Sequence, residues 1–225
     1  MVWYLLMLVS IGITIWAQVK VQGNFSKWSQ VRASSGLTGA EVARHILDRN
    51  GLSNVTIERI PGKLSDHYDP SARRIRLSEM VYDSNSIAAI SVASHECGHA
   101  LQHQESYGAL VLRHRLVPVL QFTSGAAPWL LLAGIFFRAT GLLFIGIVFF
   151  AVAVVFHLVT LPVEFNASAR AKRILASEGF IRGAEDRGVD KVLDAAALTY
   201  IAGALVALMQ LFYYIAIFLG QRNRD

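Results

Sequence analysis

Four long apolar stretches constrain the fold of this chain more than any other feature of its sequence. Each has about the twenty residues that a helix needs to cross the hydrocarbon core of a bilayer. They occupy residues 2–19, 117–137, 140–161 and 195–219. Apolar residues make up 54% of the chain and charged residues only 16%, a balance too apolar for an ordinary soluble domain. We therefore expect a mainly α-helical integral membrane protein with about four transmembrane helices.

Two of these stretches allow a second interpretation. Residues 2–19 could be a cleaved signal peptide, but no basic segment precedes them and no clear small-residue cleavage site follows, so we expect a retained anchor. The stretch 117–137 is interrupted by polar residues and a proline, and a buried or re-entrant helix is its alternative. The interrupting residues are Gln121, Thr123, Ser124 and Pro128.

The basic residues predict the orientation in the membrane. Of the 21 Lys and Arg residues, all but Arg138, Arg222 and Arg224 lie in segments 20–116 and 162–194. Because cytoplasmic segments retain Lys and Arg, we expect both segments in the cytoplasm and both termini outside. The expected parts are an anchor at 1–20, a cytoplasmic domain at 21–116, a transmembrane hairpin at 117–161 with a tight turn around Arg138, a cytoplasmic segment at 162–194, a transmembrane helix at 195–219 and a tail at 220–225.

Charge and cysteine content exclude two other classes of protein. The net charge is +5, but the basic residues are spread over loops without interleaved aromatic residues, so no nucleic-acid partner is expected. Cys97 is the only cysteine, so no intramolecular disulfide can form and the polar part is expected to face a reducing compartment. The thiol of Cys97 is expected to pack into a core.

The first polar segment predicts a small α+β domain. Thr38 and Glu41 form a capping-box pattern that opens a helix, and Gly51 ends it. Two runs of strand-forming residues, 55–60 and 73–77, are separated by turn signals and predict a small antiparallel sheet. A second helix is expected over residues 84–104, with capping residues at its start.

That second helix carries an H-E-x-x-H motif in its middle. His95 and His99 are four residues apart, so both imidazoles lie on one helix face and can reach one Zn²⁺ at about 2.0–2.1 Å. Glu96 lies one position further round the helix, beside such an ion rather than on it, which suits a general base. The motif therefore predicts a zinc site with Glu96 as its catalytic residue.

Catalytic zinc normally has three protein ligands, so a third must come from elsewhere in the chain. His103 continues the same helix face, but one helix cannot readily wrap three successive imidazoles around a tetrahedral ion, and we expect it to be solvated or to hydrogen-bond a ligand. Glu164 is the better candidate, because a lone acid in an apolar stretch is costly unless paired or metal-bound. The alternative is a salt bridge from Glu164 to Arg170 or Lys172.

Six stretches of the chain resemble the YugP-type neutral zinc metallopeptidases of bacterial membranes, which are distantly similar to HtpX-type proteases. The stretches are 65–70, 75–79, 86–90, 95–103, 161–168 and 192–200. The resemblance implies a zincin-like domain at the cytoplasmic face of the bacterial inner membrane and a gluzincin-like site, with His95, His99 and Glu164 as zinc ligands. HtpX-type relatives carry an Asp four residues after the ligand Glu, where this chain has Ser168. Asn166 or Ser168 is therefore expected to hydrogen-bond a ligand more weakly.

These observations together predict a zinc-dependent endopeptidase that acts on peptides or proteins, membrane proteins included. A role in membrane-protein quality control follows only by analogy with related families. A donor outside the zinc helix should stabilise the oxyanion, and His67 and Tyr68 are candidates, as are His157 and Tyr200. The strand at 75–78 is expected to be an exposed edge that aligns an extended peptide. The sequence does not indicate an oligomeric state.

Two further function classes compete with this prediction. In a site-2-type intramembrane protease the motif lies within a span and an Asp from another span completes the site, whereas here only a short apolar run from Ile87 precedes the motif. A metal transporter would carry ligands at the bilayer midplane, and the spans offer almost none except His157. A zinc-binding scaffold without activity would usually lack the base, and Glu96 is present.

Overall fold

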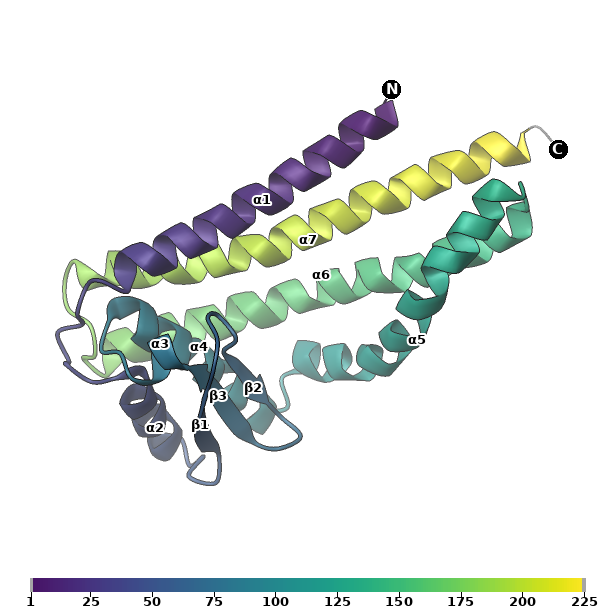
Figure 1. Ribbon diagram of the computed structural model, residues 1–225. Coiled ribbons are helices and arrows are strands. Elements are labelled where there is room, and N and C mark those ends of the chain that lie inside the picture. The colour runs from purple at the N-terminus through teal and green to yellow at the C-terminus, as the bar shows by residue number, and fades with distance from the viewer. Residues whose placement is uncertain (1, 224–225) are drawn as a thin grey trace. The chain divides into compact units, whose positions relative to one another are not determined.

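The computed structural model describes residues 2–223, with side chains from residue 4 onward, and it is mainly helical (Figure 1). The helices are α1 (Val2–Trp28), α2 (Gly39–Arg49), α3 (Glu79–Tyr82), α4 (Ile87–Gln104), α5 (Gly108–Phe136), α6 (Thr140–Ser177) and α7 (Glu185–Arg222), and the strands are β1 (Thr56–Ile60), β2 (His67–Asp69) and β3 (Arg74–Ser78). The chain forms two compact units. The helical unit comprises Met1–Ala17, Gly108–Pro162 and Thr199–Asp225, and the mixed unit comprises Gln18–Tyr107 and Val163–Leu198.

Helices α1, α5, α6 and α7 are each long and apolar enough to cross a membrane, which confirms the expected mainly helical fold with four long apolar helices. They extend beyond the apolar stretches of the sequence: α6 and α7 each have 38 residues. The extension of α6 beyond residue 161 is rich in Ala, Arg and Lys, which are good helix formers. The start of α7 carries Glu185 and Asp186, and acidic residues in a first turn stabilise a helix. The stretch with the interrupting polar residues forms one continuous helix, α5, despite Pro118 and Pro128.

Within the helical unit, α5 and α6 form a close antiparallel pair. The turn between them is as tight as expected, with Arg138 in the left-handed region at φ 52°. Glycines let the two backbones approach, because a Cβ on Gly134 would lie 2.5 Å from the Leu143 nitrogen and one on Gly146 would lie 2.9 Å from Leu131. Leu131 and Leu143 are buried at this contact.

In the mixed unit, α2, α4 and the sheet enclose an apolar core. The capping box at the start of α2 is present as expected, with Thr38 and Glu41 bonded reciprocally. Ser86 caps α4 by accepting a hydrogen bond from the Ala89 nitrogen. Burial of each large aliphatic side chain contributes roughly 1.5–3 kcal/mol to folding. Fully buried examples are Ile46 and Leu47 of α2, Ile75 and Leu77 of β3, and Ile87 and Ile90 of α4.

The sheet differs from the expected antiparallel pair. Its order is β1-β3-β2, with β1 parallel to β3 and β2 antiparallel to β3. The prediction was wrong because the segment between the two expected strands contains β2, which forms a hairpin with β3 across the turn at Asp69 and leaves β1 to join β3 from the other side. A second expectation is also wrong: β3, which contains residues 75–78, is the central strand and not an exposed edge.

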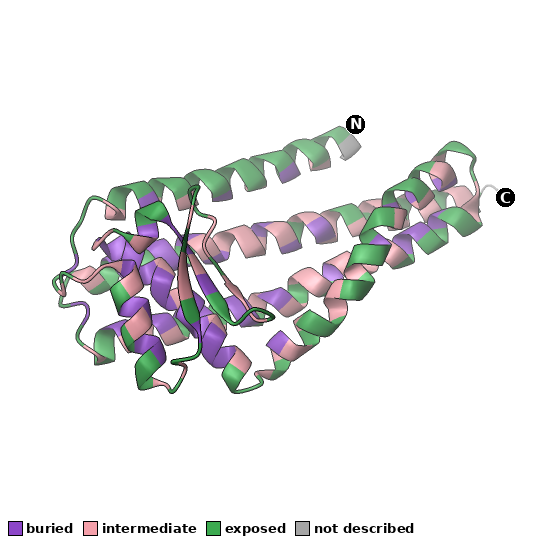
Figure 2. Ribbon diagram, turned by 60° about the horizontal axis from the view of Figure 1, so that its bottom comes forward, coloured by how far each residue is buried: buried purple, intermediate pink, exposed green. Residues whose placement is uncertain are grey.

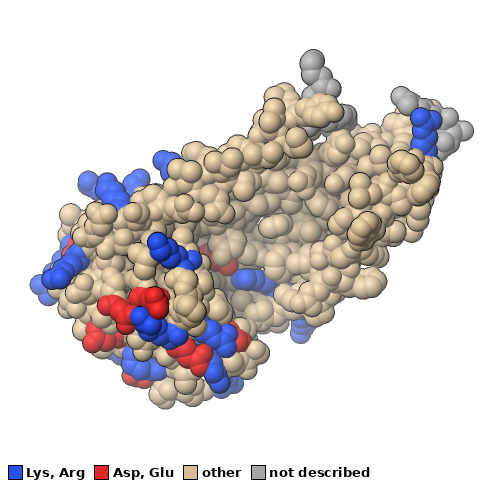
Figure 3. Space-filling view, in the orientation of Figure 1, with Lys and Arg blue, Asp and Glu red and all other residues tan. Residues whose placement is uncertain are grey.

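Burial and charge distinguish the surfaces of the two units. Figure 2 shows buried residues concentrated in the mixed unit, while α1 is exposed along almost its whole length. Only 6% of the residues in an 18-residue apolar segment of α1 are buried. Figure 3 shows the charged side chains gathered over the mixed unit, with almost none along the long apolar helices. Exposed apolar surface of this extent is typical of helices that face lipid.

Candidate metal centre

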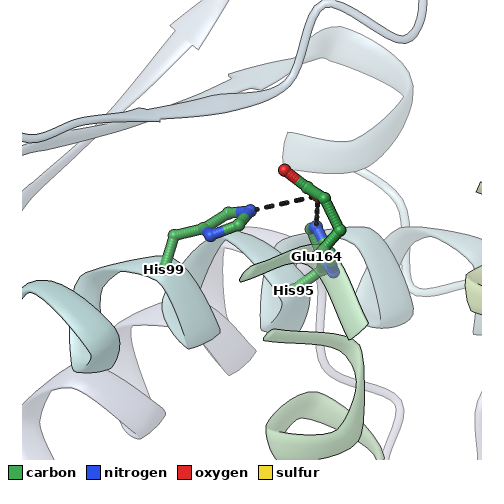
Figure 4. A group of neighbouring side chains, drawn as sticks. All are labelled: His95, His99 and Glu164. Carbon is green, nitrogen blue, oxygen red and sulfur yellow. Dashed lines mark hydrogen bonds and ion pairs between the residues drawn. The ribbon is translucent and has the colours of Figure 1, made fainter. Parts of the chain in front are cut away.

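The two histidines of the motif and Glu164 converge from two helices. His95 and His99 lie in the middle of α4, well inside a capped 18-residue helix, and Glu164 lies on α6. The Oε2 atom of Glu164 lies 3.3 Å from His95 Nε2 and 3.5 Å from His99 Nε2. In Figure 4 both imidazoles point toward this carboxylate, and one ligand atom from each of the three residues lies within 4.8 Å of the others.

Gly98 allows this convergence. It lies between the two histidines on the face of α4 that meets α6. A Cβ at this position would lie 2.7 Å from the Ala167 carbonyl oxygen and 3.1 Å from the Ala167 Cα. Such contacts with backbone atoms cannot be relieved by a rotamer change, so only glycine permits the two backbones to pass this closely. The glycine within the motif therefore determines the distance between the helix with the two histidines and the helix with Glu164.

The other nitrogen of each imidazole, Nδ1, contacts a polar side chain. His95 Nδ1 lies 3.1 Å from the hydroxyl of Ser168, and His99 Nδ1 lies 3.0 Å from Gln102 Oε1. These contacts orient both rings so that their Nε2 atoms face Glu164. Two imidazole nitrogens and one carboxylate are a ligand set of catalytic zinc. The Nδ1 atoms of both histidines already contact other side chains, which leaves the Nε2 atoms for the metal, so the residues present fit Zn²⁺.

The electrostatics of the group favour a cation. Glu164 is only 2% exposed, and a buried carboxylate requires a positive partner. Burial alone would lower the pKa of His99, but the hydrogen bond with Glu164 and the charges of Glu96 and Glu164 outweigh it, and the pKa of His99 is raised. In the metal-free chain a proton on His99 therefore helps to balance Glu164, and a metal ion competes with that proton.

Glu96 and Cys97 occupy different environments within the motif. Glu96 is 7% exposed, and no hydrogen bond to its carboxylate is formed by the part of the chain that the structure describes. Cys97 is fully buried, with its Sγ 3.7 Å from the Ala43 carbonyl oxygen, which confirms the expected packing into the core. Burial raises the pKa of the Cys97 thiol, so it stays protonated and unreactive at neutral pH.

The alternative partners of Glu164 are engaged with other carboxylates. Arg170 pairs with Glu105, and Lys172 pairs with Asp190 and Asp194. His103 does not join the metal-binding group, and its Nδ1 lies 2.8 Å from the hydroxyl of Tyr68.

The remaining predicted site residues separate into three groups. His67 is exposed, with its Nδ1 2.8 Å from the carbonyl oxygen of Ser65, two residues before it in the chain. Asn166 hydrogen-bonds no histidine among the described residues and instead accepts a hydrogen bond of 3.0 Å from Gln102. His157 and Tyr200 belong to the helical unit.

Sequence reasoning missed Gln102, which is fully buried and contacts His99 directly. Its position three residues after His99, one helical turn further on, was the available indication.

Comparison with known proteins agrees with this geometry. The family model described as "Putative neutral zinc metallopeptidase" matches residues 3–219. The chain is 58% identical over 225 residues to the "Putative membrane protease YugP" of Bacillus subtilis (strain 168), with all of both chains covered. No solved structure matches. The chain therefore belongs to the family described as "Putative neutral zinc metallopeptidase" and resembles a membrane protease over its full length.

Proposed function

We propose that this protein is a membrane-bound zinc-dependent endopeptidase, in which His95, His99 and Glu164 hold Zn²⁺ and Glu96 is the general base. The observation that carries the proposal is the convergence of two Nε2 atoms and one carboxylate oxygen from α4 and α6. Glu96 follows His95 directly on the same helix. Family membership supports the metal, and the geometry supports the ligands.

The residues divide the chemistry between them. Zn²⁺ held by the three side chains would polarise the scissile carbonyl and lower the pKa of the attacking water. The Glu96 carboxylate accepts the proton of that water and delivers it to the nitrogen of the leaving amine. Because no described side chain hydrogen-bonds this carboxylate, its oxygens are available for the transfer.

The arrangement of the sheet supports a place for the peptide substrate. β2 is one of the two edge strands of the described sheet, and its Tyr68 hydroxyl lies 2.8 Å from His103 on α4, the helix that carries the two histidines. We expect an extended peptide to pair with the outer edge of β2. The central strand β3 has partners on both sides and cannot take this role. Tyr68 and His67 on this strand stay candidates for the donor that stabilises the oxyanion.

The distribution of Lys and Arg supports an active site that faces the cytoplasm. Peptides and proteins, including membrane proteins, are the substrate class. A role in quality control rests on analogy with related families alone.

The test uses the full chain purified in detergent, with zinc content and cleavage of an unfolded protein as its two readouts. Glu96→Gln should keep its zinc and lose about 10²–10⁴-fold in turnover, because general acid–base catalysis contributes that much. Glu164→Ala should lose both zinc and activity. Glu79→Gln is the matched control, since it removes an exposed carboxylate of the mixed unit whose ion pair is with Arg59, and it should behave as wild type.

Two outcomes would contradict the proposal. A Glu96→Gln variant that cleaves as fast as wild type would exclude this peptidase mechanism. A wild-type protein that binds zinc without cleaving, or that moves zinc into sealed vesicles, would favour a scaffold or a transporter instead.

A further inference from the structure

Gln102 is a fully buried polar side chain between the zinc helix and the helix that carries Glu164. Its Oε1 lies 3.0 Å from His99 Nδ1. Its Nε2 donates to the Val163 carbonyl oxygen at 2.8 Å and to Asn166 Oδ1 at 3.0 Å. Gln102 therefore contacts the proposed ligand His99 directly, and it contacts Val163, the residue next to the proposed ligand Glu164.

The partners of Gln102 leave its amide one orientation. The Val163 carbonyl can only accept hydrogen bonds, so the amide nitrogen must face it. The amide oxygen then faces His99, and an oxygen can only accept. His99 must therefore carry a proton on Nδ1, so only Nε2, the atom that faces Glu164, can release its proton and serve as a metal ligand.

A second contact fixes the same orientation from further away. The Arg170 Nε donates to Asn166 Oδ1 at 2.7 Å, and because a guanidinium only donates, this atom of Asn166 must be the oxygen. The same oxygen faces Gln102, which must therefore present its nitrogen. Arg170 is held in turn by two bonds of 2.7 Å to Glu105 at the end of α4.

His95 lacks such a constraint. Its Nδ1 contacts the hydroxyl of Ser168 at 3.1 Å, and a hydroxyl can donate or accept. The two proposed histidine ligands are therefore supported differently: the tautomer of His99 is determined by its surroundings, and that of His95 is not.

We propose that Gln102 is a positioning residue of the metal centre. It selects the tautomer in which His99 offers Nε2 as a ligand, and it ties the turn of α6 that bears Glu164 to the zinc helix. The inference rests on the proposed function, because it assumes that His99 and Glu164 hold the metal. Loss of comparable hydrogen bonds to a ligand costs about 10–100-fold in metal affinity.

The zinc dissociation constant of the full chain in detergent, measured by competition with a chromogenic chelator, tests the inference. Gln102→Leu should weaken zinc binding about 10–100-fold. Gln104→Leu is the matched control, because Gln104 lies on the same helix and also donates to a backbone carbonyl, that of Asn50, but touches no proposed ligand. It should bind zinc as wild type does.

Two further variants test the inference if Gln102→Leu does not fold. Asn166→Asp keeps an oxygen that can accept from both Gln102 and Arg170, and it should retain wild-type affinity. Asn166→Leu removes that acceptor and should weaken binding. The ¹⁵N shifts of the histidines in the metal-free protein, recorded at alkaline pH where the imidazoles are neutral, give an independent readout, since Gln102→Leu should shift His99 away from a single Nδ1–H tautomer.

The outcomes distinguish the inference from the proposed function. The inference would be overturned if Gln102→Leu and Asn166→Leu bound zinc as tightly as wild type and differed from it only by a lower melting temperature. The proposed function would then still stand. Wild type that binds no zinc would overturn the proposed function. Weakened binding in both variants, with Gln104→Leu and Asn166→Asp unchanged, is the expected result.

Discussion

The helical unit and the mixed unit satisfy their polar side chains in different ways. In the helical unit, hydroxyls bond to the carbonyl four residues earlier on their own helix, as Ser10, Thr14 and Thr160 do at 2.8–2.9 Å. In the mixed unit, some hydroxyls also bond to their own helix, but other polar side chains bond across elements, as Gln102 does to Val163 and Ser168 does to His95.

This difference separates two kinds of sensitivity to substitution. A hydroxyl that bonds to its own helix leaves the helix self-sufficient, as a lipid-facing helix must be. A bond between elements joins segments distant in sequence, so its loss changes their relative position. We expect substitutions in the mixed unit to affect the metal centre and matched substitutions in the helical unit to have little effect on it.

The largest effect is expected for Gly98→Ala. The new Cβ would meet the Ala167 backbone at 2.7 Å, so α4 and α6 must separate and the three proposed ligands with them. Overpacking of this kind costs about 1–3 kcal/mol, and most of the zinc content should be lost. Gly125→Ala in α5 is the control, because a Cβ there meets nothing within 4 Å. Thermal unfolding and zinc content measure both, and equal behaviour of the two variants would remove the distinction between the units.

A smaller effect is expected for Ser168→Ala. The variant loses the hydroxyl 3.1 Å from His95 Nδ1, and zinc binding should weaken by up to about tenfold, the lower end of such losses. Ser177→Ala, on the same helix with its hydroxyl directed to its own backbone, should leave zinc affinity unchanged. Chelator competition measures both constants, and a Ser168→Ala affinity equal to that of wild type would show that this contact does not support the ligand.

Asp66 is expected to make stability depend on pH. Its Oδ1 accepts a 2.7 Å hydrogen bond from the Ser78 nitrogen, but burial raises the pKa of Asp66 above its ordinary value. The folded state therefore binds this proton more tightly than the unfolded state, and wild type loses stability as pH rises from about 4 through the raised pKa. Asp66→Asn should lack this loss, so its stability relative to wild type should increase over that interval. Parallel pH profiles from chemical denaturation of the two proteins would contradict this.

The smallest effect is expected for Thr160→Val in the helical unit. The Thr160 hydroxyl bonds at 2.8 Å to the Phe156 carbonyl of its own helix, so removing it frees no group on another element. Stability should change by less than about 0.5 kcal/mol, with unaltered zinc affinity. A loss as large as that of Gly98→Ala would mean that this helix face is not self-sufficient.

Local patterns explain why much of this site could be predicted. The spacing of His95 and His99 follows from the helical repeat, and the spans follow from apolar length, so neither needs knowledge of distant contacts. Glu164 could be found because an acid next to an apolar stretch is unusual and because four expected spans would return it to the side of the histidines. The structure brings its carboxylate to both imidazoles.

Contacts between distant segments explain what could not be predicted. The partners of Gln102 on α6 are Val163 and Asn166, about sixty residues away, and only its spacing of one helical turn from His99 distinguishes this glutamine from the exposed Gln104. The sheet order depended on the path of a connection whose strand, β2, has three residues and is too short for a periodic pattern. The two longer strand-forming runs, 55–60 and 73–77, therefore could not show whether they pair parallel or antiparallel.

The burial of Cys97 makes the natural sequence a ready background for site-directed labelling. The only cysteine of the chain is fully buried and its thiol pKa is raised, so maleimides and spin labels should not modify it in the folded protein. A cysteine introduced at an exposed position would then be the single reactive thiol. Membrane-impermeant reagents applied to intact cells could establish which side of the bilayer each loop faces, without altering Cys97, which packs from α4 against Ala43 of α2.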